Sequence, residues 1–497
     1  MKRGIYIAFD QLNKNFGALA QANPKNDVII LVESQRMLQS RNWHIQRLWF
    51  MISAAKHFAA ELEADGFKVI YKKSATTRDG ILAAKSELKL EKIIGCEPNS
   101  YRLIESTKDI VEYQPSDFFL TSRAEFIDWA KNQKSLLMEN FYRIQRKRFN
   151  ILMDGEKPVG GAWNFDKENR LTPPKGYEFP PYLEHKMDRI DLEVLAELKG
   201  SDLKLWGDDP HQTWGTSRKS AVLQLNYFLE NHFASFGPYE DAMLKENWSL
   251  HHSLLSPYLN IGLLHASDVI EAVRKRYQKG DIPLASCEGF IRQVIGWREY
   301  INGVYWFFGQ EYRENNHFQF DRPLLPLFTD SKATQMACVS QQISDIESRA
   351  WVHHIPRLMV LSNLALLSGI KPQEFLDWMR EVFIDAADWV MVPNVIGMGM
   401  HSDGGQMMTK PYVSGGSYIS KMGNFCKGCA YDPKLRTGET ACPFTNLYWN
   451  FLSDHEAEFT KNHRMFQQMS GLKRLKDLAE LKQDSKRILE GLSRGQI

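Results

Sequence analysis

The first 130 residues alternate short β-rich runs with amphipathic helical segments. The runs are GIYIAF, DVIILV, KVIYKK and KIIGC, and the pattern predicts a helix from about Asn42 to Asp65. This alternation is the βαβ rhythm of a parallel sheet that helices cover on both faces. We therefore expect a Rossmann-like α/β domain over residues 1–130.

The end of the first strand lacks the usual nucleotide-binding sequences. FDQLNKNFG stands where a GxGxxG or Walker loop would be. The crevice at the carboxyl ends of parallel strands is still a natural ligand site, and Asp10, Gln11 and Glu33 stand at such ends. From the residues alone, loop and helix-capping roles explain these three better than ligand binding does.

Residues 131–200 are expected to link two domains. Basic and aromatic side chains mix between Lys131 and Phe149, which favours a solvated helix face over nucleic-acid contact. Residues 154–184 carry many Gly and Pro and are typical of an irregular connector. Long helical patterns replace the strand pattern after residue 201, so residues 201–497 should form an all-α domain.

Charge and cysteine usage narrow the class of protein. Lys plus Arg is 62 and Asp plus Glu is 60, so any basic surface must be local. Six cysteines in 497 residues are too few for a disulfide scaffold. MKRGIYIAF lacks the apolar run of a signal peptide, and no apolar stretch approaches a membrane span. A reducing cytoplasm is the expected compartment, and it leaves thiols free for metal.

The stretch from Trp351 to Met398 reads as helix, connection, helix and then a Pro-containing loop. Burial of its titratable side chains is costly unless they are paired or bound to something polar. A pocket wall explains them, and a hydrated surface is the alternative. These side chains belong to His353, His354, Arg357, Asp385 and Asp388.

Two other segments have a pocket-like pattern. His252, Ser253 and Ser256 precede a helix, where hydroxyls and free N–H groups suit phosphate oxygens, although N-capping by Ser256 explains the pattern too. Gln293 and Arg298 interrupt a strongly apolar helix, which could line a pocket or belong to the core.

The cysteines suggest a metal site. A CxxC with a third Cys thirteen residues beyond it, together with one distant Cys, suits zinc or a four-iron cluster. A redox dithiol is the alternative, but no βαβ pattern surrounds this CxxC. The four residues are Cys338, Cys426, Cys429 and Cys442, whereas Cys96 and Cys287 are expected to be buried free thiols.

The segments SLLSPYLNIGLL, GWREY, WVHHIPRLM and FIDAADWVMVPN resemble, in order and spacing, the flavin-binding half of the photolyase and cryptochrome family. The resemblance covers nearly the whole chain and implies an antenna domain followed by a helical FAD-binding domain. The four cysteines resemble the cluster ligands of the prokaryotic iron-sulfur branch, whose repair members are (6-4) photolyases. A [4Fe-4S] cluster is therefore implied.

The resemblance also implies roles for individual residues. The antenna implied is 6,7-dimethyl-8-ribityllumazine, held by Asp10, Gln11 and Glu33. Trp378 matches the tryptophan nearest the flavin in the photoreduction path. The FAD ligands implied are Tyr239, His252, Ser253, Ser256, Gln293, Arg298, Arg357, Asp385, Asp388 and Met391.

Two positions depart from the family pattern. Met391 stands near flavin N5, where many relatives have Asn or an acid. Leu358 stands where animal (6-4) enzymes have a second histidine, so a two-histidine mechanism does not transfer.

The activity implied is light-driven repair of (6-4) photoproducts in UV-damaged DNA by a cytoplasmic monomer. His354 is the expected proton donor, with His353 second, because an imidazolium can give a proton near neutral pH. A blue-light photoreceptor is the alternative, and cyclobutane-dimer repair is a weaker third reading.

Overall fold

The main sheet of the protein has five parallel strands in the order β4-β2-β1-β5-β6. The computed structural model describes residues 2–497. Ile5 in β1 pairs with Ile29 in β2 and with Ile94 in β5. The strands are β1 (Arg3–Tyr6), β2 (Asp27–Ser34), β4 (Lys68–Ser74), β5 (Lys92–Cys96) and β6 (Glu112–Gln114). The first four coincide with the predicted β-rich runs.

Helices cover both faces of this sheet because β1 and β2 present apolar side chains to each side. Ile5, Ile29 and Leu31 share a core with α2 (Ile45–Ala64). Val28 and Ile30 share another with α3 (Thr77–Glu87). The short helices α1 (Gln35–Leu38) and α4 (Tyr101–Thr107) follow the carboxyl ends of β2 and β5. The predicted Rossmann-like α/β fold is confirmed, whereas the domain bound at residue 130 stays a prediction.

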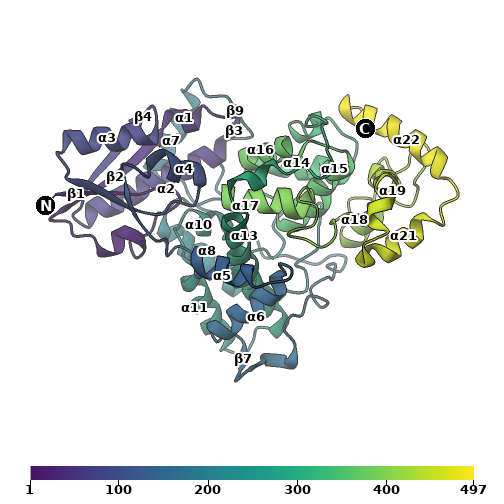
Figure 1. The fold of residues 1–497 in the computed structure, drawn as a ribbon, viewed down its shortest axis with the longest axis horizontal. Coiled ribbons are helices and arrows are strands. Elements are labelled where there is room, and N and C mark those ends of the chain that lie inside the picture. The colour runs from purple at the N-terminus through teal and green to yellow at the C-terminus, as the bar shows by residue number, and fades with distance from the viewer. Residues whose placement is uncertain (1) are drawn as a thin grey trace.

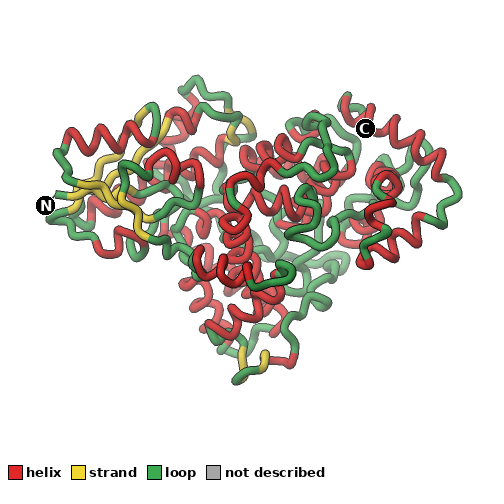
Figure 2. The backbone as a smooth tube through the Cα atoms, in the orientation of Figure 1, coloured by secondary structure: helices red, strands yellow, loops and turns green. Residues whose placement is uncertain are grey.

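The predicted helix at Asn42 begins later, because residues 43 and 44 form a short strand. β3 (Trp43–His44) pairs with β9 (Leu205–Trp206), and the His44 side chain then caps α2. A second pair, β7 (Met153–Asp154) and β8 (Lys157–Pro158), is an isolated hairpin. Figure 2 shows the main sheet gathered at the N-terminal end, with helices filling most of the rest.

Residues 131–200 contact both domains, and the boundaries proposed for the linker stay a prediction. α6 (Met138–Arg148) packs on the helical part, and α7 (Arg189–Lys199) packs on α2. Trp49 Nε1 of α2 donates to the Asp191 carbonyl of α7 at 3.0 Å. Arg146 of α6 donates to the Ile151 and Leu152 carbonyls, just before the connector, and to the Trp163 carbonyl within it.

The rest of the chain is helical. The helices around the central core are α5 (Arg123–Lys131), α8 (Arg218–Asn231), α9 (Phe233–Phe236), α10 (Ser256–Asn260), α11 (Ala266–Tyr277), α12 (Leu284–Ile291), α13 (Glu299–Phe308), α14 (Ala337–Arg349), α15 (Asn363–Leu367), α16 (Pro372–Val382) and α17 (Asp388–Val392). The C-terminal helices are α18 (Gly416–Met422), α19 (Pro443–Asp454), α20 (Glu456–Phe459), α21 (Phe466–Leu472) and α22 (Leu478–Ser493).

Figure 1 shows the C-terminal helices at the end of the molecule opposite the sheet. The short 3₁₀ helices are η1 (Gly17–Gln21), η2 (Val159–Gly161), η4 (Gln310–Glu314), η5 (Pro326–Phe328) and η8 (His463–Met465). No helix within residues 2–497 combines the length and the apolar character that crossing a bilayer requires.

The loop expected before Met398 is instead helical. α17 begins at Asp388 and continues into η7 (Pro393–Gly399), a π-helix. Pro393 does not end the helix, because a proline lacks only its own N–H and the wider π-helical turn accommodates its ring.

Candidate active site

A cavity of about 630 Å³ lies within the helical domain, a size typical of cofactor sites. Its walls come from segments far apart in sequence, including the connector, α10, α12, α16 and α17. Ten of the residues predicted from sequence line it: His252, Ser253, Ser256, Gln293, Arg298, His353, His354, Arg357, Asp385 and Met391.

Three π-helices line this cavity. They are η3 (Arg292–Arg298), η6 (Pro356–Ser362) and η7. Gln293 and Arg298 reach the cavity from η3, Arg357 from η6, and Asn394 from η7. π-helical turns are rare and concentrate at functional sites, because they turn side chains away from the positions that a regular helix would give them.

Arg357 and Asp385 form the central ion pair of the cavity. Nη1 and Nη2 of Arg357 donate to the two carboxylate oxygens at 2.9 and 3.1 Å, which is the bidentate arrangement. The Ser256 hydroxyl donates to Asp385 at 2.6 Å, so Ser256 does not cap α10. Asn260 Nδ2 holds the Asp385 carbonyl at 2.7 Å. The carboxylate is therefore fixed in place and satisfied on both oxygens.

The three histidines of the cavity form a cluster. His353 is buried and stacks on the half-buried His252, with ring centroids 4.2 Å apart and an angle of 20° between the ring planes. Burial, reinforced by the neighbouring histidines, lowers the pKa of both rings well below the ordinary value. The His354 side chain is 45% exposed, and its Nε2 lies 3.8 Å from Asp241 Oδ1. His354 is thus the one of the three that water and a carboxylate both reach.

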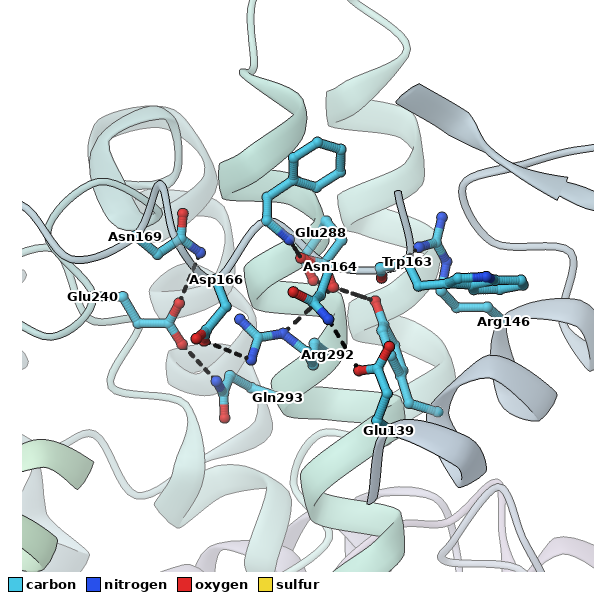
Figure 3. Close-up of polar contacts among 12 residues, drawn as sticks. Glu139, Arg146, Trp163, Asn164, Asp166, Asn169, Glu240, Glu288, Arg292 and Gln293 are labelled. Carbon is cyan, nitrogen blue, oxygen red and sulfur yellow. Dashed lines mark hydrogen bonds and ion pairs between the residues drawn. The ribbon is translucent and has the colours of Figure 1, made fainter. Parts of the chain in front are cut away.

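A buried polar network forms one wall of the cavity, as Figure 3 shows. Arg292 lies between two buried carboxyls, and its Nη1 donates to Asp166 of the connector at 3.1 Å. Glu240 accepts from Gln293 and from Asn169. Glu288 accepts from Tyr142 at 2.8 Å and from the Phe165 N–H at 3.0 Å. Burial raises the pKa of both glutamates, although Arg292 opposes this.

This network was not predicted from the sequence, apart from Gln293. Glu288 lies in an apolar stretch of the sequence, and a charged residue inside such a run was the available signal, whereas Glu240 is followed by Asp241 and has no such signal. Asn260, Asp241 and Trp389 also line the cavity without having been predicted. Their partners are distant in sequence, so no local pattern indicated them.

Several buried polar atoms in the wall have no partner within residues 2–497. They are His252 Nε2, His353 Nδ1, Arg292 Nη2, Arg298 Nε and Trp389 Nε1. A buried group left unpaired costs about 1–3 kcal/mol, so this wall is built to meet a polar ligand. Most of these atoms are N–H donors, which suits a ligand rich in acceptors, such as one that carries phosphates and a heteroaromatic ring. The residues present therefore fit a flavin nucleotide.

Three predicted residues lie outside the cavity. The Tyr239 ring packs on His251 and Tyr177. Asp388 pairs with Arg380 at 2.6 Å and lines a separate cleft at the domain junction. Trp378 is buried, donates to the Phe328 carbonyl at 2.8 Å and packs on Phe383. The next residue of α16, Met379, lines the cavity, whereas Trp378 does not.

The four predicted metal-binding cysteines converge. Cys338 lies in the first turn of α14, Cys442 immediately precedes α19, and both line a small space with Cys426 and Cys429. All four thiols are free. A Cβ at Gly416 would lie 2.7 Å from Cys442 Sγ, so the backbone approaches closely here. Helix N-termini favour thiolates, and the apolar surroundings suit a shielded four-thiolate centre.

The three predicted antenna residues lie at the carboxyl end of the sheet. Burial, partly opposed by hydrogen bonds from Asn99 and the backbone, raises the pKa of Asp10 to about 6. Gln11 donates to the Glu97 carbonyl at 2.9 Å, which links β1 to the end of β5. Glu33 instead contacts β4, where it accepts from the Tyr71 hydroxyl at 2.7 Å.

The structure thus joins a parallel α/β domain to a helical domain whose cavity is lined by N–H donors. A family model described as deoxyribodipyrimidine photo-lyase-related protein matches residues 5–214. The chain belongs to the photolyase and cryptochrome family, because a curated relative is 39% identical over 486 residues. Membership implies a flavin cofactor.

That relative is a (6-4) photolyase from Agrobacterium fabrum, and the match covers 94% of each chain. Two solved structures share the fold. A bacterial class III photolyase from Agrobacterium tumefaciens has a TM-score of 0.56 at 16% identity and covers 85% of this chain and 86% of its own. A cryptochrome from Synechocystis sp. PCC6803 has a TM-score of 0.55 at 12% identity and covers 85% and 88%.

Proposed function

We propose that the protein is a DNA photolyase that repairs (6-4) pyrimidine-pyrimidone photoproducts with light. The observation that carries this proposal is the 39% identity to the Agrobacterium (6-4) photolyase across 94% of both chains. The histidine cluster in the cavity supports it, because this repair needs a proton donor beside the lesion. The damaged base would be extruded from the duplex, which is easier for a poorly stacked lesion.

FAD is the cofactor we propose for the cavity, and when reduced and illuminated it supplies the electron that repair needs. The unpartnered N–H groups of Arg298 and Trp389, with Ser253 and Gln293, would bind it. The flavin ring system is proposed to lie beside the Arg357–Asp385 pair. The pair supports this position because the two carboxylate oxygens of Asp385 and the Nη1 and Nη2 atoms of Arg357 are held in place by their mutual hydrogen bonds. Met391 offers no hydrogen bond of its own at the cavity wall.

His354 is the proposed proton donor. Its side chain is 45% exposed and its Nε2 lies 3.8 Å from Asp241 Oδ1, so it is the histidine of the cluster that solvent and a lesion can reach. His353 is a poorer candidate, because burial keeps it neutral. We propose that His353 orients the cluster through its stack on His252.

We also propose a [4Fe-4S] cluster on Cys338, Cys426, Cys429 and Cys442, supported by their convergence and their free thiols. The proposed antenna is 6,7-dimethyl-8-ribityllumazine near Asp10, Gln11 and Glu33, with Trp378 carrying electrons to the flavin site during photoreduction. We further propose that the protein is a monomer, that its partner is UV-damaged DNA, and that it acts in the reducing cytoplasm.

The decisive test is illumination of the purified protein with an oligonucleotide that carries one (6-4) lesion. Chromatography should show restored bases in the light and none in the dark. An oligonucleotide with one cyclobutane dimer serves as the substrate control and should stay unrepaired. Photoreduction without repair of either lesion would instead favour a blue-light photoreceptor.

A further inference from the structure

A second cleft, separate from the flavin cavity, lies between the α/β domain and the helical domain. It has a volume of about 420 Å³ and is lined by Arg36 after β2, by Tyr101 and Arg102 of α4, and by Tyr305, Arg313 and Asp388. Figure 1 shows α4 on the side of the α/β domain that faces α13 and α17. The Tyr101 N–H donates to the Tyr305 hydroxyl at 3.3 Å, and the Tyr101 hydroxyl donates to the Trp306 carbonyl at 3.1 Å.

The cleft has more positive than negative charge. The charged residues that line it are Arg36, Arg102 and Arg313 against Glu105 and Asp388. Glu105 is also paired with Lys108, and Arg313 contacts Asp377 and Glu314. Three guanidinium groups therefore share the cleft wall with two carboxylates.

The positive charges that matter are those without a carboxylate partner. Arg41 and Arg380 each contact two carboxylates. Within residues 2–497, neither Arg36 nor Arg102 has an ion-pair partner. Burial lowers the pKa of Arg102, and the positive charges of Arg380, Arg41 and Arg313 lower it further, against the opposing effect of Asp388. Arg36 and Arg102 are both solvent-accessible residues, so their guanidinium groups at the wall of the cleft can reach a ligand that enters from solvent.

We propose that this cleft binds a phosphorylated small molecule of the nucleoside-diphosphate class. A guanidinium group binds phosphate oxygens in a bidentate manner, and two unpaired arginines of the α/β domain, Arg36 of α1 and Arg102 of α4, match two phosphate groups. The cavity is larger than an inorganic phosphate requires and has the size of a nucleotide site. The half-buried ring of Tyr101 provides an aromatic surface for a base.

This site is distinct from the two cofactor sites proposed above. None of Asp10, Gln11 or Glu33 lines the cleft, and the flavin cavity lies across α17. Asp388 and Val392 of α17 line the cleft, whereas Trp389 and Met391 line the flavin cavity. The inference does not depend on which lesion the protein repairs.

The experiment is calorimetric titration of the flavin-loaded protein with ADP, with pyrophosphate and with adenosine. ADP and pyrophosphate should bind, and adenosine should not. Arg102→Gln and Arg36→Gln should each weaken ADP binding about tenfold or more, since each removes a charge-assisted contact. Arg189→Gln is the matched control, because Arg189 is 80% exposed on α7 and lies outside the cleft.

Three results would overturn the proposal. One is no binding of ADP or pyrophosphate to the wild-type protein, and another is unchanged ADP affinity in both cleft variants. The third is that Arg102→Gln releases the antenna or weakens binding of undamaged duplex DNA while ADP affinity is unaffected. That result would assign the arginine to the antenna or to the DNA surface. Flavin content and circular dichroism equal to wild type show that each variant is folded.

Discussion

His353 and His354 are sequence neighbours with opposite environments. His353 lies in the irregular segment before the helix and His354 is the first helical residue, so one ring can enter the protein while the other faces the opening. His353 is 4% exposed and stacks on His252, whereas His354 is at the solvent side near Asp241. The sequence predicted the pair but could not rank it by burial.

Replacement of His354 tests this difference directly. His354→Ala should abolish (6-4) repair while FAD content and photoreduction stay at wild-type levels, because neither needs the imidazole proton. Repair is followed by chromatography under steady light, with exposed His211→Ala as the control. Repair at the wild-type rate by His354→Ala would move the proton donor to His353.

Removing the Asp385 charge should empty the flavin cavity. Asp385→Asn leaves the half-buried Arg357 without its carboxylate partner, at a cost of about 1.5–3 kcal/mol. We expect the purified variant to lose most of its FAD, measured by absorbance after denaturation. Asp345→Asn is the matched control, because Asp345 is equally buried and pairs with Arg349 at 2.6 Å outside the cavity. Equal flavin in both variants would contradict the proposed ligand set.

At the scale of elements, the N-termini of α14 and α19 bring Cys338 and Cys442 together. Cys429→Ser should remove iron and lower thermal stability, because metal ligation adds to folding free energy. Iron analysis and thermal unfolding measure the two effects. Cys287→Ser, a buried thiol outside the cluster, should keep its iron. Zinc in anaerobically prepared wild-type protein would contradict the iron-sulfur centre.

The connector depends on one buried arginine. Arg146 is fully buried and donates to the carbonyls of Ile151, Leu152 and Trp163. Arg146→Ala should leave these acceptors unpaired and raise the rate of proteolysis between residues 150 and 165, by tenfold or more for about 2 kcal/mol lost. Exposed Arg143→Ala is the control. Equal cleavage rates would show that other contacts hold the connector.

At the scale of the whole molecule, the two-domain fold could be predicted because its signals are local. Alternating β-rich and helical runs gave β1, β2, β4 and β5, and the buried β2 strand reads as a continuous apolar run. The contacts within the cavity wall could be predicted only in part. Segments such as η6 indicated a polar wall, but the contacts of Arg292 with Asp166 and Glu288 join distant residues that only tertiary packing brings together.

The pH dependence of global unfolding should show the effect of Asp10. Its raised pKa, about 6, means that the folded antenna-free protein holds a proton that the unfolded chain releases near pH 4, so this residue destabilises the fold as pH rises from about 4 to 6. Asp10→Asn should therefore be more stable than wild type above pH 6, by up to about 3 kcal/mol, and equal to it below pH 4. Denaturant unfolding across this range measures the difference.

Asp27→Asn is the opposite control for that measurement. Burial alone would raise the pKa of Asp27, but the hydrogen bonds from Arg3 and Asn23 outweigh burial and lower it. This variant should lose stability at neutral pH. An Asp10→Asn curve parallel to wild type at every pH would contradict the assignment.

The three π-helices around the cavity make the direction of the side chains in its wall depend on the number of residues in each helix. Each π-helical turn holds one residue more than the α-helical turn it replaces, so residues beyond it are rotated by about 100° relative to those before it. A single-codon deletion within η3 would turn Arg298 away from the cavity and carry the apolar face of α13 with it. We therefore expect relatives that bind flavin in this way to have the same number of residues in each of these helices. Insertions and deletions should be found in the connector instead.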